Sequence, residues 1–377
     1  MIVKKPLYGI AEAGTHWWAT YWKHHQEKLN MITSSYDPCL LISNSKNVRF
    51  GIVGMQTDDT LILADEQFLE LENKELIDAN IKAKPGEHLT NDTPLIFNGC
   101  TIRRTKNDLM LTQKGQGKKI GKVNNSEQYR EQRARGAYIA TICQPEASYD
   151  LSTAAQHQDP SDENIKLLNK RLDWQVKNLN RGLRFIPLEK DRMKLFVFVD
   201  GSFANNKDLS SQIGFIILLA NENRSDENTF EIRGNIIHYS STKSKRVTRS
   251  VLASEIYGMV AGVDIGLAIR STLQIVTSQL DIPDIPVVVC TDSYSLYECL
   301  VKLGTTKEKR LMIDIMALRQ SYERRELTEV RWINGLDNIA DAMTKANPNN
   351  SLEKFIDTNT LEVRVEGWVK RETRTKV

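Results

Sequence analysis

KLFVFVDGSF, residues 194 to 203, decides the fold of the last part of this chain. Its five apolar residues, Leu195 to Val199, are too few for a helix and are rich in β-branched and aromatic side chains. This is typical of a strand buried on both faces. The strand ends on Asp200, followed by Gly201 and Ser202. A carboxylate at the end of a buried strand needs a partner charge, a hydrogen-bond network or a metal ion.

The bulk composition is that of an ordinary globular protein. With 377 residues, 40% of them hydrophobic and 26% charged, the chain is long enough for two or three domains. No apolar run approaches the ~18 residues of a membrane span, and the N-terminus has no apolar signal region. We therefore expect an intracellular protein, in the cytoplasm or nucleus, without a membrane partner. Its five scattered cysteines favour a reducing compartment and argue against structural zinc.

Positive charge is concentrated in one segment. The net charge is only +3, but residues 101 to 136 contain ten Lys or Arg against three acids. Such a segment is a candidate surface for a polyanion such as nucleic acid. A solvated connector has the same composition, so charge alone does not decide between the two interpretations.

The first hundred residues contain one helical and one hairpin pattern. Thr15 to Leu29 has four aromatic residues at helical spacing, which indicates a core helix. Further on, Asp58 and Asp59 lie between two apolar runs, at the tip of a predicted β-hairpin. Acids in that position are either simple turn formers or ligands of a divalent cation.

The order of motifs in this region resembles reverse transcriptases of copia-type retrotransposons. KKPLYGIAEAGTHWW, SYDPCLLIS, QTDD and FNGCTIRRTKNDLMLTQ are similar to the later motifs of the polymerase palm. The resemblance implies that residues 1–110 are a partial palm, with Asp58 and Asp59 as a vestigial polymerase metal site. Gln56 replaces the usual aromatic residue, and the motif with the third carboxylate would have to precede Met1. Because a two-metal clamp needs that carboxylate, we expect no primer extension from this chain alone.

Residues 111–190 continue the resemblance as a connection or tether. ENIKLLNKRLDWQVKNLNRGLRFIPL has apolar residues at helical spacing and predicts an amphipathic helix. Pro187 and the charged residues after it mark a boundary. We interpret this segment as a module with no chemistry of its own.

Beyond Asp200 the pattern predicts three strands and then a helix. Gln212 to Ala220 and Phe230 to Tyr239 complete an antiparallel meander. From Thr248 to Arg270 the apolar residues recur with a helical period, and Glu255 shares their inward face. A single buried glutamate has ordinary explanations, either a salt bridge or an edge position that reaches solvent.

Two more acids follow in similar settings. Ile285 to Cys290 predicts another buried strand, and it is followed by Asp292 at the start of a helix. After a further helix and a strand at Thr328 to Ile333, Asp341 lies in a short apolar helix. Functional groups of α/β sheets gather beyond strand ends, so these acids are more informative together than singly.

VDGS, ASEIYG, CTDSYS and NIADAMTK resemble the ribonuclease H domain that follows reverse transcriptase in copia-type elements. The resemblance implies that residues 191–346 form this domain, with 347–377 as an unassigned tail. The fold would be α/β and α+β, a ribonuclease H-like mixed five-stranded sheet with flanking helices. The implied metal-binding tetrad is Asp200, Glu255, Asp292 and Asp341, which would hold two Mg²⁺ or Mn²⁺ ions.

The implied activity is endonucleolytic hydrolysis of the RNA strand of RNA–DNA hybrids. One metal ion generates hydroxide and the second stabilises the leaving oxygen, which explains the clustered acids. Many relatives have a histidine between the third and fourth acids, whereas this chain has none after His238. Asn334 lies in that region, and we expect slower turnover rather than loss of activity.

Substrate contacts are predicted from polar residues near the strand ends. RNA is distinguished by its 2′-hydroxyls and groove shape, and phosphates are held by basic side chains. The candidate residues are Ser202, Asn205, Ser241, Thr242, Lys243, Lys245, Arg246 and Arg249. The basic run among them has the alternative interpretation of a solvated loop.

Two other functions stay open at this point. One is a catalytically inactive, nucleic-acid-binding remnant of a degenerate element. The other is a different nuclease on the same fold, such as an exonuclease or resolvase, which the polymerase-like segment disfavours. The sequence does not indicate an oligomeric state.

Overall fold

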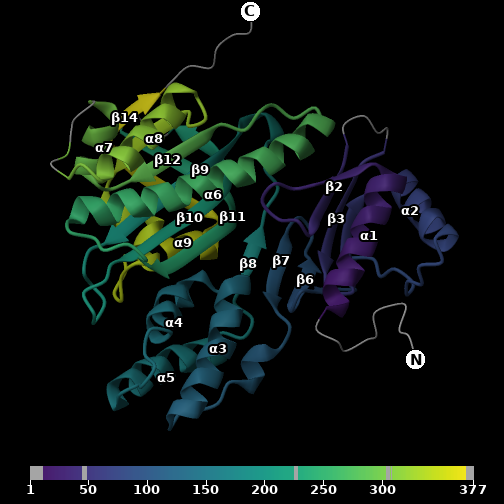
Figure 1. Ribbon diagram of the computed structural model, residues 1–377, viewed down its shortest axis with the longest axis horizontal. Helices are drawn as coiled ribbons and strands as arrows, with labels where there is room; N and C mark the ends of the chain where they lie inside the picture. The colour runs from purple at the N-terminus through teal and green to yellow at the C-terminus, as the bar shows by residue number, and fades with distance from the viewer. Residues whose placement is uncertain (1–11, 45–48, 225–227, 303–305, 307, 371–377) are drawn as a thin grey trace, which may run out of the picture. The chain divides into compact units, whose positions relative to one another are not determined.

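The computed structural model describes residues 12–44, 49–224, 228–302, 306 and 308–370 (Figure 1). Two compact units share the chain. The first contains the described residues up to Asn98 together with Ala268–Asp284, and the second contains Gly99–Leu267 and the described residues from Ile285 onward. The boundaries expected near residues 110, 190 and 346 stay a prediction.

The first unit is built on an antiparallel sheet in the order β1–β2–β3–β4. Its elements are α1 (Ala13–Leu29), β1 (Met31–Thr33), β2 (Leu40–Ser43), β3 (Gly51–Gln56), β4 (Asp59–Ala64), α2 (Glu66–Asp78) and β5 (Leu95–Phe97). Tyr21 of α1 is buried, and the three tryptophans of α1 pack partly buried against the same apolar cluster. The predicted core helix is therefore confirmed.

A buried polar contact joins α1 to α2 in this unit. Tyr21 Oη donates a hydrogen bond of 2.9 Å to Oε1 of Glu72, and Nε2 of His25 lies 2.9 Å from the same oxygen. The side chain of His25 is fully buried. Buried polar groups are stable only when they are hydrogen-bonded, and here each of the three groups supplies a partner for another.

The second unit is built around a closed barrel in the order β10–β11–β14–β13–β12–β9. Its strands are β9 (Met193–Ser202), β10 (Gln212–Arg224), β11 (Thr229–Lys243), β12 (Val287–Thr291), β13 (Glu329–Ile333) and β14 (Thr360–Lys370). β9 pairs antiparallel with β10 and parallel with β12. Leu195 to Val199 are fully buried, as the opening stretch of sequence predicts.

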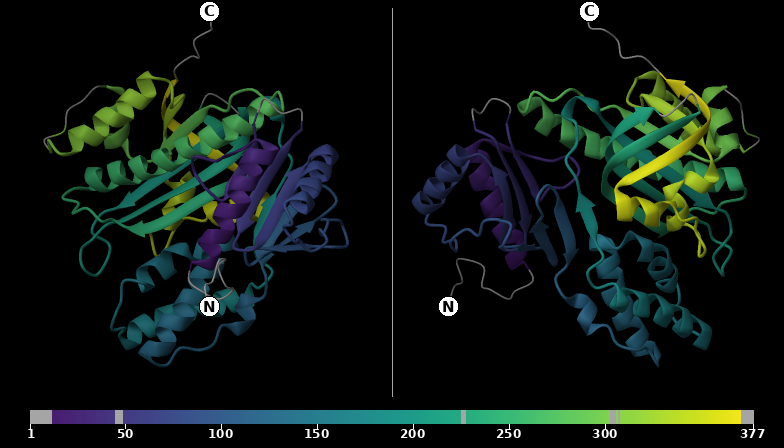
Figure 2. Two further views of the ribbon diagram at one scale, coloured as in Figure 1. Left: turned by 45° about the vertical axis from the view of Figure 1, so that its right-hand side comes forward. Right: turned by 180° about the vertical axis from the view of Figure 1, so that it is seen from behind.

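The sheet has one strand more than the sequence indicates. The meander β9–β10–β11 and the parallel strands β12 and β13 form the expected mixed ribonuclease H-like arrangement, so the fold class is confirmed. The assumed tail instead contributes α9 (Ser351–Thr358) and β14, drawn in yellow in Figure 2. β14 pairs with both β11 and β13. Buried Leu361 and Val363 alternate with exposed residues, a period-two pattern typical of a strand.

The long helix α6 (Val251–Gln279) has its part up to Leu267 in the second unit, and this part lies over the strands of the barrel in Figure 1. A Cβ at Gly258 would lie 2.6 Å from the carbonyl oxygen of Asp200, and one at Gly262 would lie 2.8 Å from Cγ1 of Val199. Only glycine permits this close approach of helix and strand. Two shorter helices, α7 (Tyr294–Val301) and α8 (Leu311–Glu323), follow in the chain.

We expected no stretch of the chain to approach the length and hydrophobicity of a membrane span, and this expectation is wrong. Among the described residues, α6 is long and apolar enough to cross a membrane, and 56% of its most apolar window is buried within the protein. The apolar sequence of α6 is interrupted by Gly, Ser and Thr residues and by Glu255, Asp264 and Arg270, so it contains no long unbroken apolar run. The packing of α6 on β9 is that of a core helix.

The expected connection, residues 111–190, forms a small sheet and a helical group together with the last residues of the expected palm. These elements are β6 (Cys100–Arg104), β7 (Leu109–Gln113), α3 (Ser126–Cys143), α4 (Ser148–Ala154), α5 (Asp162–Lys177) and β8 (Leu183–Phe185). α3, α4 and α5 pack around their own apolar cluster and are seen together in Figure 1. The predicted amphipathic helix is α5, and a capping box between Ser161 and Asn164 fixes its start.

Candidate metal centre

Three of the four predicted acids converge at one edge of the barrel. Each of Asp200, Glu255 and Asp292 offers a carboxylate oxygen that lies within 4.8 Å of the other two. Asp200 is 2% exposed and Glu255 is 7% exposed. No other such group occurs among the residues that the structure describes. We call these three residues the carboxylate cluster.

The convergence follows from strand register and from close packing of α6. β9 and β12 are parallel neighbours, with Val199 beside Thr291, so the acid that follows each strand emerges at the same edge. α6 approaches this edge at Gly201, where a Cβ would lie 2.4 Å from the carbonyl carbon of Ser254. Ser254 Oγ also donates to the carbonyl oxygen of Gly201 at 3.1 Å. Glu255 is thereby brought to the two aspartates.

Burial and mutual repulsion disfavour ionisation of these carboxyl groups. Burial, with Asp292 as the next cause, raises the pKa of Asp200 to about 6. Burial and then the charges of Asp200 and Asp292 raise the pKa of Glu255 well above its ordinary value. Burial also raises the pKa of Asp292, against the opposing influence of Lys345. Three clustered acids are therefore costly to ionise unless a cation lies among them.

The donor set fits a hard divalent cation. Oε2 of Glu255 is buried and has no hydrogen-bond partner among the residues described. A buried acceptor without a partner costs free energy, and a metal ion would remove that cost. Converging carboxylate oxygens are the ligands that Mg²⁺ and Mn²⁺ prefer.

The fourth predicted ligand, Asp341, is buried but does not belong to the carboxylate cluster. It lies in a short 3-10 helix, Ile339–Met343. Its Oδ1 accepts a hydrogen bond from Nζ of Lys345, and its Oδ2 accepts one of 2.8 Å from the backbone N–H of Asn349. Both oxygens are thus engaged within the protein, and its role as a metal ligand stays a prediction.

The sequence interpretation missed two residues that hydrogen-bond the cluster and a third whose charge lies beside it. Nδ2 of Asn338 donates to Oδ1 of Asp292 at 3.2 Å and to the carbonyl oxygen of Val199 at 3.0 Å. Thr344 Oγ1 donates to Oδ2 of Asp200. The acids raise the pKa of the Lys345 ammonium although burial acts to lower it. All three lie within the quoted motif NIADAMTK, so the signal was present.

The polar residues predicted to contact a substrate have different environments. Asn205 Nδ2 donates to the carbonyl oxygen of Thr344 at 2.7 Å, and Ser241 Oγ donates to that of Met343 at 2.6 Å. These two donors are used within the protein. Ser202 is half-buried and Thr242 is exposed.

The basic run before α6 is partly neutralised. Lys243 forms an ion pair with Asp208, and Arg246 forms one of 3.0 Å with Asp314. Lys245 and Arg249 are exposed, and neither forms an ion pair with any residue in the described ranges. These two are the basic side chains still available to a phosphate.

Asp58 and Asp59 lie apart from any carboxylate cluster found among the described residues. Both are exposed at the turn between β3 and β4, where Gln56 pairs with Asp59. The predicted hairpin is confirmed. Their assignment to a vestigial polymerase metal site stays a prediction.

Comparison with curated proteins gives one group of relatives, and no family model matches the chain. The Transposon Ty1-BR Gag-Pol polyprotein of Saccharomyces cerevisiae is 22% identical over 392 residues, and the Ty1-GR1 polyprotein of the same yeast is 22% identical over 389. Each alignment covers 92% of this chain and 21% of the relative. The chain therefore spans about a fifth of the length of these relatives. The expected resemblance to a retrotransposon Pol polyprotein is confirmed.

Among solved structures, LC11-RNase H1 from compost has 20% identity and a TM-score of 0.28, covering 43% of this chain and 96% of that protein. The same enzyme in complex with an RNA/DNA hybrid has 20% identity and a TM-score of 0.24, covering 35% and 78%. The protease-reverse transcriptase of prototype foamy virus has 12% identity and a TM-score of 0.22, covering 83% and 43%.

Proposed function

We propose that this chain, a retrotransposon Pol fragment with a ribonuclease H-like domain, hydrolyses the RNA strand of RNA–DNA hybrids as an endonuclease. The observation that carries the proposal is the convergence of Asp200, Glu255 and Asp292, one of which keeps a buried oxygen without a partner. The order of the copia-type motifs along the sequence supports the same substrate class.

Asp200, Glu255 and Asp292 would hold Mg²⁺ or Mn²⁺, with Asp341 completing a two-ion site. When bound, such ions activate water and stabilise the leaving 3′ oxygen. Asn338 and Thr344 orient two of the carboxylates by donating hydrogen bonds to them. Lys345 places a positive charge beside the acids, where it attracts a phosphate.

An RNA–DNA hybrid would contact residues at the ends of the same strands. Lys245 and Arg249 are exposed and supply charge for phosphates. Ser202 and Thr242 supply hydroxyl groups for contact with the sugar. The expected location in the cytoplasm or nucleus is part of the same proposal.

A second candidate function, a catalytically inactive nucleic-acid-binding remnant, is favoured by one observation. Both carboxylate oxygens of Asp341 are engaged, by Lys345 and by the backbone of Asn349. If this arrangement persists when metal ions are present, the second ion lacks a ligand.

A cleavage assay tests the proposal. The purified chain is incubated with a labelled RNA–DNA hybrid, a duplex DNA and a duplex RNA, with Mg²⁺ or Mn²⁺ and then with chelator. We expect cleavage of the hybrid alone, lost in Asp292→Asn and retained in the control Asp58→Asn. Binding of the hybrid without cleavage under every metal condition would overturn the proposal and support the inactive remnant.

A further inference from the structure

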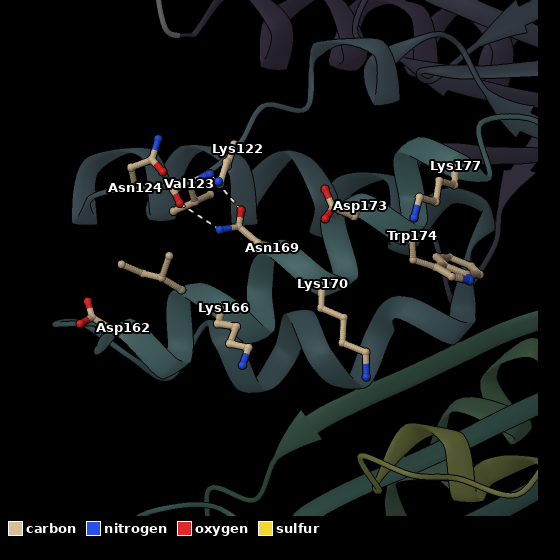
Figure 3. A pocket seen from close by; sticks show the side chains of 11 residues that line it. Lys122, Val123, Asn124, Asp162, Lys166, Asn169, Lys170, Asp173, Trp174 and Lys177 are labelled. Atoms are coloured by element: carbon tan, nitrogen blue, oxygen red, sulfur yellow. Dashed lines mark hydrogen bonds between the residues drawn. The ribbon is translucent and has the colours of Figure 1, made fainter.

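A basic groove lies on the helical group of the second unit, on α5 (Figure 3). It has a volume of about 760 Å³ and lies between α5 and the segment from Lys122 to Asn124 that precedes α3. The groove residues that matter here are Lys122, Lys166, Asn169, Lys170, Trp174 and Lys177. We call this cavity the α5 groove.

The groove is held open by a hydrogen-bonded pair at its centre. Asn169 Oδ1 accepts a bond of 2.9 Å from the backbone N–H of Val123, and Asn169 Nδ2 donates one of 2.9 Å to the carbonyl oxygen of the same residue. Figure 3 shows this double contact joining the segment to α5. The two walls are thus fixed relative to each other before any ligand arrives.

The charge of the groove suits a chain of phosphates. Its four lysines are exposed, and none forms an ion pair with a residue that the structure describes. Lys166, Lys170 and Lys177 follow one another along α5 and span ~16 Å at 1.5 Å per residue. That length accommodates several consecutive phosphates, whose contacts with lysine drive binding by counterion release.

Trp174 adds a surface on which a base can stack. Its side chain is half-buried at the end of the groove and packs partly against the apolar cluster of the helical group. The guanidinium of Arg171 lies over the ring, 4.9 Å from its centroid. A row of basic residues beside an aromatic ring is the combination that binds single strands without sequence preference. A volume of this size also accommodates a nucleotide-sized group.

The two acids of the groove distinguish between polyanions. Asp162 and Asp173 also line it. Both repel phosphates as well as carboxylates, and neither of these ionised groups can donate a hydrogen bond to them. The amino groups of nucleobases can donate to these carboxylates, so a nucleic acid is the better match.

We propose that the α5 groove binds a single strand of nucleic acid, with its lysines on the phosphates and Trp174 beneath a base. This function goes beyond the proposed cleavage, because the groove shares no residue with the carboxylate cluster. It assigns a task to the segment that the sequence interpretation left without one.

Fluorescence anisotropy of a labelled 12-nucleotide single strand tests the proposal. The full chain carries Asp292→Asn and chelator is present, so that cleavage cannot affect the readout. We expect Lys166→Gln with Lys170→Gln to weaken binding by about ten-fold or more near 0.1 M salt, and to lower the log–log salt slope by ~1.4. The matched control is Lys190→Gln with Lys354→Gln, which removes the same charge from two exposed lysines outside the groove.

Three further arms decide the outcome. Unchanged binding in the groove variant overturns the proposal. An equal loss in the control also overturns it, because binding would then depend on the total charge of the protein rather than on the groove. Trp174→Leu should weaken binding while leaving the salt slope unchanged. A glutamate polymer that displaces the strand and binds more tightly would identify an acidic polypeptide instead. Hybrid cleavage by the chain without Asp292→Asn is measured separately, so failure of either proposal is recognised independently.

Discussion

The second unit contains two clusters of buried acids in one barrel, and their electrostatics are opposite. In the carboxylate cluster the acids face one another. In the other, which we call the ion-pair cluster, Glu222 and Glu329 face Arg331 and Lys194. Arg331 lies 2.9 Å from Glu222 and 2.5 Å from Glu329, and Lys194 lies 3.1 Å from Glu329.

The pKa values of Glu222 and Asp200 shift in opposite directions. Burial acts to raise the pKa of Glu222, but hydrogen bonds and charges from Arg331 and Lys194 outweigh it, and the pKa is lowered. Burial acts in the same direction on Asp200 and prevails there. The comparison teaches that burial alone does not mark a functional acid. What marks it is that the protein cation beside it, Lys345, does not outweigh burial and the repulsion among the acids.

The largest expected effect would break the ion-pair cluster. Arg331→Met leaves Glu222 and Glu329 buried without their main partner and should lower the free energy of unfolding by about 3–5 kcal/mol. Arg331 also lies 4.3 Å from the ring centroid of Phe230, so packing is lost as well. Urea unfolding measures the effect, with the exposed Arg192→Met as control. A loss below about 1 kcal/mol would show that the pairing contributes little.

The next effect concerns activity and separates the two clusters. Asp292→Asn should reduce hybrid cleavage at least a hundred-fold, on the order of 3 kcal/mol in transition-state free energy. Glu222→Gln should leave cleavage unchanged at a temperature where the protein is folded. Initial rates on a labelled hybrid give the comparison. Equal loss in both variants would contradict a division of roles between the clusters.

Metal addition should stabilise one cluster only. At a hundred times its dissociation constant, a divalent cation that binds the folded state adds about 2.7 kcal/mol to the free energy of unfolding. We expect this increase with Mn²⁺ in the unaltered chain and in Glu222→Gln, and its loss in Asp292→Asn or after chelation. Thermal unfolding measures it. Stabilisation that survives in Asp292→Asn would place the ion elsewhere.

Acid should weaken the ion-pair cluster. Because the folded-state pKa of Glu222 lies below the ordinary value of 4.5, its contribution is fully present above pH 4.5 and is lost as the pH falls toward the folded value. Glu222→Gln should flatten this part of the stability profile, with a smaller change than metal addition causes. Unfolding measured between pH 3 and 7 tests this, and an unaltered acid slope would contradict it.

The smallest expected effect concerns the absent histidine. The Asn334 side chain donates a hydrogen bond to Glu366 and accepts one from Arg364, each at 3.2 Å. These two bonds restrict its rotation. Asn334→His should raise hybrid turnover by a few-fold if a proton carrier is what the site lacks. Single-turnover rates across pH measure it, and an unaltered rate argues against the expectation.

The carboxylate cluster could largely be predicted from sequence, because strand ends fix where Asp200 and Asp292 emerge and helical period fixes Glu255. Asp341 was harder, because its orientation depends on Lys345 and Asn349, which no periodic pattern reveals. Its neighbours Asn338 and Thr344 lie in the quoted motif, but the sequence does not show which carboxylates they donate hydrogen bonds to.

The ion-pair cluster could not be predicted at all. Glu222 lies beyond Ala220, where the predicted strand ended, yet β10 continues to Arg224. Its inward polar side chain is tolerated because Arg331, more than a hundred residues later, balances it. β14 was missed for a similar reason, since charged residues alternate with the few apolar ones that it buries.

β14 also has a consequence for how the domain is made. It pairs with β11, about 130 residues earlier in the chain, and with β13, about 30 to 40 residues earlier. Contacts at such separation form late and slow folding. During synthesis the edges of β11 and β13 remain uncovered until residues 360–370 leave the ribosome, and uncovered strand edges invite pairing with other chains. Closure by β14 is therefore the step that protects the nascent domain from aggregation.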